Sequence, residues 1–213
     1  MMDFSELNKM VETGKVKIVK TLVTEALENG VAPKEILEQG LLPGMNVIGD
    51  KFKNNEVYVP EVLIAARAMK AGVELLKPHM QTGEMGGAGT AVIGTVKGDL
   101  HDIGKNLVKM MLEGKGINVI DLGVDVSAEQ FVAQAQENNA DLIVCSALLT
   151  TTMGEMEAVV KQSEAAGIRE KVWIMVGGAP ITQEYCDKIG ADCYTTDAAS
   201  AGDAALEHLK AKA

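Results

Sequence analysis

The hydrophobic residues before position 90 follow the spacing of helices. Apolar side chains recur there every three or four positions, as at Val16, Val19 and Val23, which places them on one helix face. Pro33 suits the first turn of a helix, and short connections favour an antiparallel arrangement. The pattern predicts a bundle of four or five helices over residues 1–82. The predicted breaks between helices lie at Gly14, Asn29-Gly30, Pro43-Gly44 and Asn54-Asn55.

From Thr90 on, short aliphatic runs alternate with amphipathic stretches. Strands that are aliphatic along their whole length and separated by helices are typical of a parallel sheet covered on both faces. The fold class is therefore α/β over residues 90–213, and we expect a doubly wound, flavodoxin-like sheet of five parallel strands. The strands are predicted at Thr90–Val96, Asn118–Leu122, Leu142–Ser146, Val172–Val176 and Cys193–Thr196.

A glycine-rich segment joins the two halves. Residues 83–89 contain four glycines and show no apolar periodicity. Such composition is typical of a flexible connection. We therefore predict a hinge at 83–89 that lets the helical domain swing relative to the α/β domain.

The topology predicts where a ligand binds. In doubly wound sheets, ligands lie beyond the carboxyl ends of the strands where the winding direction reverses, here between the first and third strands. Asp99 and His101 follow the first strand, and Ser146 ends the third. A carboxylate bonded to one ring nitrogen of a histidine orients the ring and makes the other nitrogen a better metal ligand. Taken alone, however, Asp99 also suits a helix cap, and His101 an exposed first-turn residue.

Three segments together resemble the cobalamin-binding signature of corrinoid-dependent methyltransferases and mutases. They are Asp-x-His-x-x-Gly ending at Gly104, Ser-x-Leu beginning at Ser146, and the pair Gly177-Gly178. The intervals agree as well, with 41 residues between Gly104 and Ser146 and 28 between Leu148 and Gly177. The chain is thus similar to corrinoid-binding methyl-carrier proteins, and the likeness covers nearly its whole length.

The resemblance assigns roles to individual residues. His101 would bind cobalt from below the corrin ring, and Asp99 would brace its imidazole. The third member of this relay is a serine in the family and falls on Thr152 here. The glycines would let the backbone approach the nucleotide tail of the cofactor closely. The further cofactor contacts implied are Gly98, Asp102, Ile103, Gly104, Ser146, Leu148, Thr150, Gly177, Gly178 and Ala179.

The helical half resembles the corrinoid-capping domain of the same proteins. The segment Tyr58-Val59-Pro60-Glu61 followed by a helix of small residues carries this likeness. It implies that Tyr58 and Val62, together with Ala66, cover the upper face of the corrin ring. On the residues alone, Tyr58 also suits an aromatic position in the bundle core.

Composition and charge narrow the class of protein. A net charge of −10 disfavours nucleic acid and anionic membranes, and most of the acidic surplus lies after Thr90, where 18 acidic residues face 10 basic ones. No segment is apolar enough to cross a membrane. The three cysteines, Cys145, Cys186 and Cys193, lack metal-site spacing and read as reduced thiols. We therefore expect a cytoplasmic protein.

The resemblance implies a methyl carrier that is not catalytic alone. The resemblance implies cobalamin or a related corrinoid, as methylcobamide or hydroxocobamide. It also implies a substrate-specific methyltransferase, a second methyltransferase acting on tetrahydrofolate or a thiol, and a reductive activator as partners. Among methyl donors it favours methoxylated aromatics (O-demethylation), with methylamines, methanol and betaines left open.

Other functions share parts of the pattern. The small subunit of an adenosylcobalamin mutase carries the same signature, but the preceding helical bundle argues against it. A cobalamin-sensing regulator would need a basic DNA-reading helix. A phospho-receiver domain has the same sheet order but needs an aspartate where this chain has Ser146. A flavin protein also fits the topology, although nothing in it requires His101.

Overall fold

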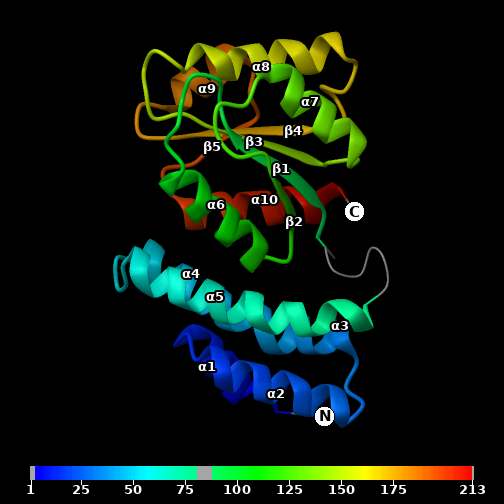
Figure 1. The fold of residues 1–213 in the computed structure, drawn as a ribbon. Coiled ribbons are helices and arrows are strands. Elements are labelled where there is room, and N and C mark those ends of the chain that lie inside the picture. Colours follow the sequence, from blue (N-terminus) through cyan, green and yellow to red (C-terminus); the bar gives the residue numbers. More distant parts are fainter. Residues whose placement is uncertain (1–2, 81–87, 213) are drawn as a thin grey trace. The chain divides into compact units, whose positions relative to one another are not determined.

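The structure, a computed structural model, describes residues 3–80 and 88–212. The chain divides into two compact units, a helical one made mainly of residues before 88 and an α/β one made mainly of residues from 88 on (Figure 1). The predicted hinge at 83–89 lies, apart from its last two residues, outside the described residues.

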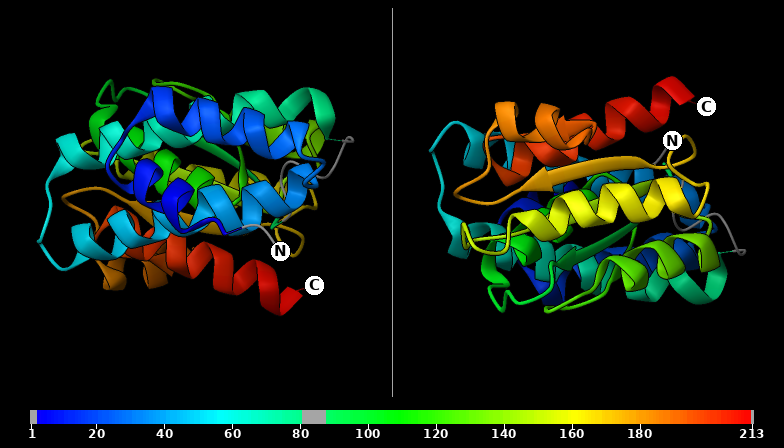
Figure 2. Two further views of the ribbon diagram at one scale, coloured as in Figure 1. Left: turned by 90° about the horizontal axis from the view of Figure 1, so that it is seen from below. Right: turned by 90° about the horizontal axis from the view of Figure 1, so that it is seen from above.

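The helical unit contains the predicted bundle. Helices α1, α2, α4 and α5 pack against one another, and α2 and α5 share an extensive contact (Figure 2, left). Val19 and Val23 of α2 are fully buried, as their spacing predicts. The elements are α1 (Ser5–Glu12), α2 (Val16–Glu28), a single turn α3 (Pro33–Glu35), the π-helical η1 (Ile36–Leu41), α4 (Leu42–Lys53), α5 (Val59–Leu76) and the 3-10 turn η2 (Lys77–His79).

One predicted break in this unit is wrong. The chain stays helical through Pro43-Gly44, because Pro43 lies in the first turn of α4 and a π-helical segment leads into it. Proline has no N–H, so it cannot bond the carbonyl group four residues earlier, which belongs to Gln39. The side-chain amide of Asn8 donates to that carbonyl at 2.8 Å and to the carbonyl of Gly40 at 2.7 Å. A residue of α1 thus replaces the bond that proline removes.

The α/β unit contains a five-stranded parallel sheet in the order β2-β1-β3-β4-β5, which confirms the predicted flavodoxin-like winding. The last strand is shorter than predicted, because Asp197 accepts hydrogen bonds from the backbone N–H and the hydroxyl of Ser200 and so begins the next helix. The strands are β1 (Thr90–Thr95), β2 (Asn118–Asp121), β3 (Leu142–Ser146), β4 (Trp173–Gly177) and β5 (Cys193–Tyr194).

Helices cover both faces of the sheet. Alternate residues of β1 point to opposite sides, so Val92 packs against α7, α8 and α9 while Ile93 packs against α6 and α10. Figure 2 (right) shows α7, α8 and α9 across one face, and Figure 1 places α6 and α10 on the other. The helices are α6 (Ile103–Gly114), α7 (Ala128–Glu137), α8 (Gly154–Ala165), α9 (Gln183–Ile189) and α10 (Ala198–Lys212). None of the described helices is long and apolar enough to span a membrane.

The bond between Asn8 and the π-helical segment gives a stability prediction. Asn8→Ala leaves the carbonyl of Gln39 without its donor, and the free energy of unfolding should fall by about 1–2 kcal/mol. Urea unfolding followed by circular dichroism measures this change. The control is Asn54→Ala, which removes only a 3.4 Å exposed bond to Glu56 and should change stability by less than about 0.5 kcal/mol. Equal effects of the two substitutions would contradict the role of Asn8.

Candidate functional site

The predicted ligand site lies where the winding of the sheet reverses. Helix α6, which follows β1, covers one face, and α8, which follows β3, covers the other. The two loops therefore separate at the carboxyl edge of the sheet, and a ligand can approach between them. The first loop carries Asp99 and His101, and the second, which follows Ser146 at the end of β3, carries Leu148 and Thr152.

Asp99 joins these two loops. Its side chain is fully buried, and its Oδ1 accepts hydrogen bonds from the backbone N–H of His101 at 3.1 Å and from Nδ1 of the His101 ring at 2.7 Å. Its Oδ2 accepts from the backbone N–H groups of Leu148 at 2.8 Å and Leu149 at 3.2 Å, and from the hydroxyl of Thr152 at 2.9 Å. One carboxylate thus fixes both loops.

These hydrogen bonds decide the charge of Asp99. Burial by itself would raise the pKa of the carboxyl group, since it disfavours the charged form. The donors, with the backbone of Leu148 first and the side chain of His101 second, outweigh burial and hold the pKa of Asp99 well below its usual range. Asp99 is therefore a carboxylate at neutral pH.

The ionised Asp99 sets the tautomer of His101. A carboxylate only accepts hydrogen bonds, so Nδ1 of the ring is the donor and carries the proton. Nε2 is then left with its lone pair, and no group in the described part of the chain bonds to it. The side chain is 50% exposed, and the buried hydroxyl of Thr95 donates to the His101 carbonyl group at 2.8 Å. His101 therefore presents Nε2 outward from a fixed backbone.

Thr152 lies within the same network. Its hydroxyl is 2.9 Å from Oδ2 of Asp99 and 3.0 Å from the carbonyl oxygen of Leu149, and the residue is buried. A hydroxyl group has one proton, so it donates to one of these two oxygens at a time. The added methyl group of threonine, relative to the serine of the resembled family, leaves the hydroxyl within hydrogen-bonding distance of Asp99.

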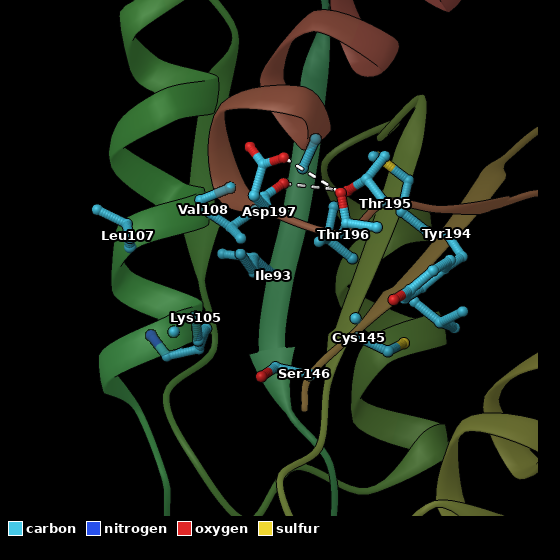
Figure 3. A pocket seen from close by; sticks show the side chains of 18 residues that line it. Ile93, Lys105, Leu107, Val108, Cys145, Ser146, Tyr194, Thr195, Thr196 and Asp197 are labelled. Atoms are coloured by element: carbon cyan, nitrogen blue, oxygen red, sulfur yellow. Dashed lines mark hydrogen bonds between the residues drawn. The ribbon is translucent and has the colours of Figure 1, made fainter. Parts of the chain in front are cut away.

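A groove opens beside this network, between α6 and α10. It encloses about 190 Å³ over the carboxyl ends of β1, β3 and β4 (Figure 3). Of the predicted residues, Gly104, Ser146, Gly177 and Gly178 line it. The sequence did not predict the other lining residues, because they come together only when β5, α6 and α10 pack around the ends of the strands. The unpredicted lining residues are Ile93, Lys105, Leu107, Val108, Val144, Cys145, Met175, Val176, Tyr194, Thr195, Thr196, Asp197, Ala198 and Ala201.

The glycines of the site differ in whether the backbone angle or the packing requires a glycine. Gly98 and Gly178 have φ angles of +78° and +134°, which other residues rarely adopt, and a Cβ on Gly178 would collide with the backbone of Ala147. Gly104 and Gly177 have no such angle, and a Cβ on either would have no protein atom within 4 Å. Neither the backbone nor the packing requires glycine at 104 or 177, so the space above them is available to a ligand.

Aliphatic side chains surround His101 on the surface. Leu100 is 71% exposed and Ile103 is 78% exposed, and Val124, Leu148 and Leu149 of the neighbouring loops are exposed as well. Large aliphatic side chains gathered at one exposed edge indicate a binding surface. A flat ligand with an apolar face would cover these side chains.

The remaining predicted residues have separate surroundings. Asp102 accepts a hydrogen bond from the side chain of Asn106 within α6, and Thr150 and Ala179 are exposed loop residues. In the helical unit, Tyr58 is 71% exposed at the start of α5, so it lies outside the bundle core. Val62, in the first turn of α5, is fully buried.

Lys105 anchors the first turn of α6. Its side chain is almost fully buried, and its ammonium group donates to Asp121 at the end of β2 at 2.6 Å and to Asn106 at 2.8 Å. Burial would raise the pKa of Asp121, but Lys105 and then the backbone of Gly123 lower it to about 2. This ion pair fixes the helix that follows the Asp99–His101 loop.

The family models that match this chain cover both units. A B12 binding domain matches residues 89–206, and a second B12 binding domain matches residues 4–77. The dimethylamine corrinoid protein of Methanosarcina barkeri is 46% identical over 88% of each chain. Trimethylamine corrinoid protein 1 of Methanosarcina mazei is 45% identical over 89% of this chain and 90% of its own length. The chain belongs to the B12-binding corrinoid protein family, which confirms the resemblance seen in the sequence.

Solved structures support the same relationship. The methanol:cobalamin methyltransferase complex MtaBC of M. barkeri contains a chain that is 30% identical, with a TM-score of 0.86 over 96% of this chain and 78% of that one. A cobalamin-binding protein of Desulfitobacterium hafniense is 26% identical, with a TM-score of 0.79 over 98% of this chain and 99% of that one. Both likenesses extend over the helical and the α/β units.

The site fits a corrinoid. The described residues contain no cluster of three His, Cys, Asp or Glu side chains that could hold a metal ion. A single imidazole suits a metal whose other positions are filled by a macrocycle. The aliphatic surface around His101 suits the apolar face of a corrin ring, and the space above Gly104 and Gly177 suits its nucleotide tail. The buried Cys145 thiol has its pKa raised by burial, so it stays neutral in the groove wall.

The lowered pKa of Asp99 makes its contribution to stability depend on pH. Because the folded-state pKa lies below the unfolded value of about 4, the contribution is complete above that value and is lost as the pH falls through the folded pKa. Asp99→Asn should therefore lower the free energy of unfolding by about 2–3 kcal/mol at pH 7, and the difference from wild type should shrink below about pH 4. Urea unfolding between pH 2.5 and 7 measures this.

The matched control is Asp187→Asn, an exposed carboxylate bonded only to the Gln183 side chain among the described residues. It should change stability by less than about 0.5 kcal/mol at every pH. A difference between wild type and Asp99→Asn that is constant over the whole pH range would contradict the assignment.

Proposed function

We propose that this chain carries a methyl group on a bound corrinoid, with His101 as the protein ligand to cobalt. The observation that supports this most is the His101 imidazole braced by buried Asp99, three residues before the glycine that opens the groove. The corrinoid supplies, when bound, a cobalt centre that can accept a methyl group and give it up again. The chain supplies ligation, orientation and shielding.

Asp99 and His101 act together on one proton. Nδ1–H stays bonded to the carboxylate, so Nε2 is the atom that either binds the metal or takes up a proton. The hydrogen bond to Asp99 orients the ring and makes Nε2 a better metal ligand. Thr152 donates to the other carboxylate oxygen of Asp99. This bond takes up part of the carboxylate's negative charge and so weakens the hydrogen bond between Asp99 and the Nδ1–H of His101.

The groove is the proposed place for the nucleotide tail. Its floor is aliphatic, with Ile93, Val144 and Met175 contributing, and suits the flat base of the tail. Its end near β5 is polar, because Thr195 and Asp197 lie there (Figure 3). Polar groups at that end suit the sugar and phosphate of the tail.

The helical unit is the proposed cap over the upper face of the corrin ring. Tyr58, which precedes α5, and Leu63 in its first turns are exposed, and they can present an apolar surface to a ligand. Val62 is buried, and Ala66, one turn further along α5, is half-buried. The glycine-rich segment 83–89 would let this unit move away when a partner enzyme needs access.

The relatives' names bear on the methyl source. Two of them are called dimethylamine and trimethylamine corrinoid proteins, at 46% and 45% identity. We therefore place a methylated amine first among the substrates whose methyl group this chain receives. Methoxylated aromatics, which the sequence resemblance favours, are the second candidate. Supplying the reduced holoprotein and a candidate methyltransferase with each substrate would separate them.

The proposed partners are enzymes that the carrier meets in turn. A substrate-specific methyltransferase loads the methyl group, and the similar chain in the MtaBC structure belongs to a methanol:cobalamin methyltransferase complex. A second methyltransferase passes the group to tetrahydrofolate or a thiol, and a reductive activator restores cobalt after oxidation. The three cysteines are free thiols, which is typical of proteins in the reducing cytoplasm, where we place this carrier.

A mutase subunit or a cobalamin sensor is the alternative. Both would bind a corrinoid through the same α/β site, so His101 ligation does not separate them from a carrier. The form of cofactor extracted from the purified protein does. An adenosyl form required for turnover would support the mutase, whereas methyl or hydroxo forms support the carrier.

His101→Ala tests the ligation. The variant, reconstituted with hydroxocobalamin, should bind at least about tenfold more weakly, because a metal–imidazole bond is lost while the groove is intact. Its absorption spectrum should also differ from that of wild type. His79→Ala, an exposed histidine outside the α/β unit, is the control and should match wild type. Unchanged spectra and affinity in His101→Ala would refute the proposed ligation.

Gly104→Ala tests the proposed tail site, because the substitution should raise the stability of the protein and weaken its binding of corrinoid. The new Cβ meets no protein atom within 4 Å and lies in α6, so the free energy of unfolding should rise by about 0.5–1 kcal/mol. The same methyl group should weaken corrinoid binding at least about tenfold, since it occupies the space proposed for the tail. Absorbance titration with hydroxocobalamin and urea unfolding measure the two effects.

Gly154→Ala is the matched control for Gly104→Ala. Gly154 also lies in the first turn of a helix, a Cβ added to it would also meet no protein atom within 4 Å, and it does not line the groove. The Gly154→Ala variant should gain about as much stability as Gly104→Ala and should bind corrinoid as tightly as wild type. Loss of binding in both variants, or in neither, would argue against the tail lying over Gly104.

A further inference from the structure

The loop between β2 and α7 touches the segment that carries the proposed cobalt ligand. It runs beside the end of β1, where Val96 and Val126 form a parallel bridge. The backbone N–H of Val126 donates to the Thr95 carbonyl, and the backbone N–H of Thr95 donates to the carbonyl of Gly123, both at 3.0 Å. The loop is therefore attached to the sheet and can act as a fixed support.

Asp125 makes two contacts from this loop. Its carboxylate accepts a hydrogen bond from the backbone N–H of Gly98 at 2.7 Å. Its own backbone N–H donates to the carbonyl of Asp99 at 3.1 Å. One residue thus holds the two peptide units on either side of the Gly98–Asp99 unit, Lys97–Gly98 through its N–H and Asp99–Leu100 through its carbonyl group.

The backbone of Asp125 is unusual. Its φ angle is +55°, in the left-handed region that few residues other than glycine, asparagine and aspartate adopt readily. The residue is exposed, so burial does not explain its identity. Aspartate provides both the backbone angle and the acceptor that Gly98 needs.

Asp99 is held from two directions as a result. The β3 loop binds its carboxylate through Leu148, Leu149 and Thr152, and Asp125 binds its backbone from the β2 side. The N–H of Asp99 itself donates to the carbonyl of Val96 at 3.1 Å, which holds the unit between them. A shift of the backbone on either side of this unit would move the carboxylate of Asp99 and with it the ring of His101, and the two bonds to Asp125 oppose that shift.

We propose that Asp125 is a positioning residue for the cobalt ligand, acting by locking the backbone on both sides of the Gly98–Asp99 peptide unit. It does not touch the ligand itself. The inference rests on the proposed ligation of cobalt by His101. Without the lock, the loop must be ordered when the corrinoid binds, and the ordering weakens both binding and the axial bond.

Three substitutions separate the contributions of Asp125. Asn keeps the left-handed preference and an acceptor oxygen, Gly keeps only the backbone freedom, and Ala keeps neither. The first measurement uses the protein without corrinoid and follows exchange of the Gly98 amide hydrogen by NMR. Exchange should quicken about tenfold or more in Asp125→Gly and Asp125→Ala and stay within about twofold in Asp125→Asn.

The second measurement uses each variant loaded with hydroxocobalamin and reduced to cobalt(II). The histidines of each variant are labelled with ¹⁵N, so a doublet in the electron paramagnetic resonance signal marks ligation by the chain and a triplet marks the cofactor's own base; this doublet is the nitrogen splitting followed here. The share of cobalt that gives the doublet should fall at least about threefold in Asp125→Gly and Asp125→Ala. Asp125→Asn should restore it, and corrinoid affinity should follow the same order. A residue that merely stabilised the fold would leave the coordination of the loaded fraction unchanged.

Asn139→Ala is the matched control, because Asn139 also holds a left-handed backbone, at φ +47°, but lies at the opposite edge of the sheet, before β3. It should match wild type in both measurements. Unchanged Gly98 exchange in Asp125→Gly would overturn the lock, and normal nitrogen splitting in Asp125→Gly and Asp125→Ala would overturn the positioning role. Wild type without nitrogen splitting would instead overturn the ligation by His101, since the exchange measurement needs no corrinoid.

Discussion

The site depends on one buried carboxylate that is kept charged. Asp99 has no exposed surface, and a charge in such a place is unfavourable unless several donors compensate it. Here the donors come from two loops on either side of the winding reversal. The hydrogen bonds that compensate the charge are therefore the same ones that hold the two loops of the site together. The orientation of His101, its tautomer and the exposure of Nε2 all follow from this arrangement.

The glycines show how function can be separated from folding. Gly98 and Gly178 are explained by their backbone angles, and any protein with this chain path would need them. Gly104 and Gly177 have no conformational or packing reason to lack a side chain. Both line the groove, unlike Gly154, and the proposed function gives them a reason outside the protein, a ligand that approaches the backbone closely.

Much of the fold could be predicted from the sequence. Aliphatic runs locate the strands within one or two residues, since the central strands, buried on both faces, are mostly aliphatic. The local pattern could not show that helix continues through Pro43, because the bond that makes this possible comes from Asn8, far away in the chain. Strand β5 also ends earlier than predicted, because the side chain of Asp197 begins α10 sooner than hydropathy indicates.

The site was predictable where its residues are close in sequence and less so elsewhere. The spacing of Asp99 and His101 is enough to suggest their hydrogen bond, and the family resemblance adds Thr152. Asp125 and the α10 side of the groove carry no signal in the sequence, because their roles arise only when β2 and β5 take their places in the sheet.

The central claim is that a histidine nitrogen of this chain, and not the cofactor's own base, occupies the lower position at cobalt. The most direct test labels the chain's three histidines with ¹⁵N and records the electron paramagnetic resonance spectrum of the cobalt(II) complex. The account predicts that the nitrogen triplet of the unlabelled protein becomes a doublet. A triplet that persists in the labelled protein would show that the nitrogen comes from the corrinoid, and it would contradict the account.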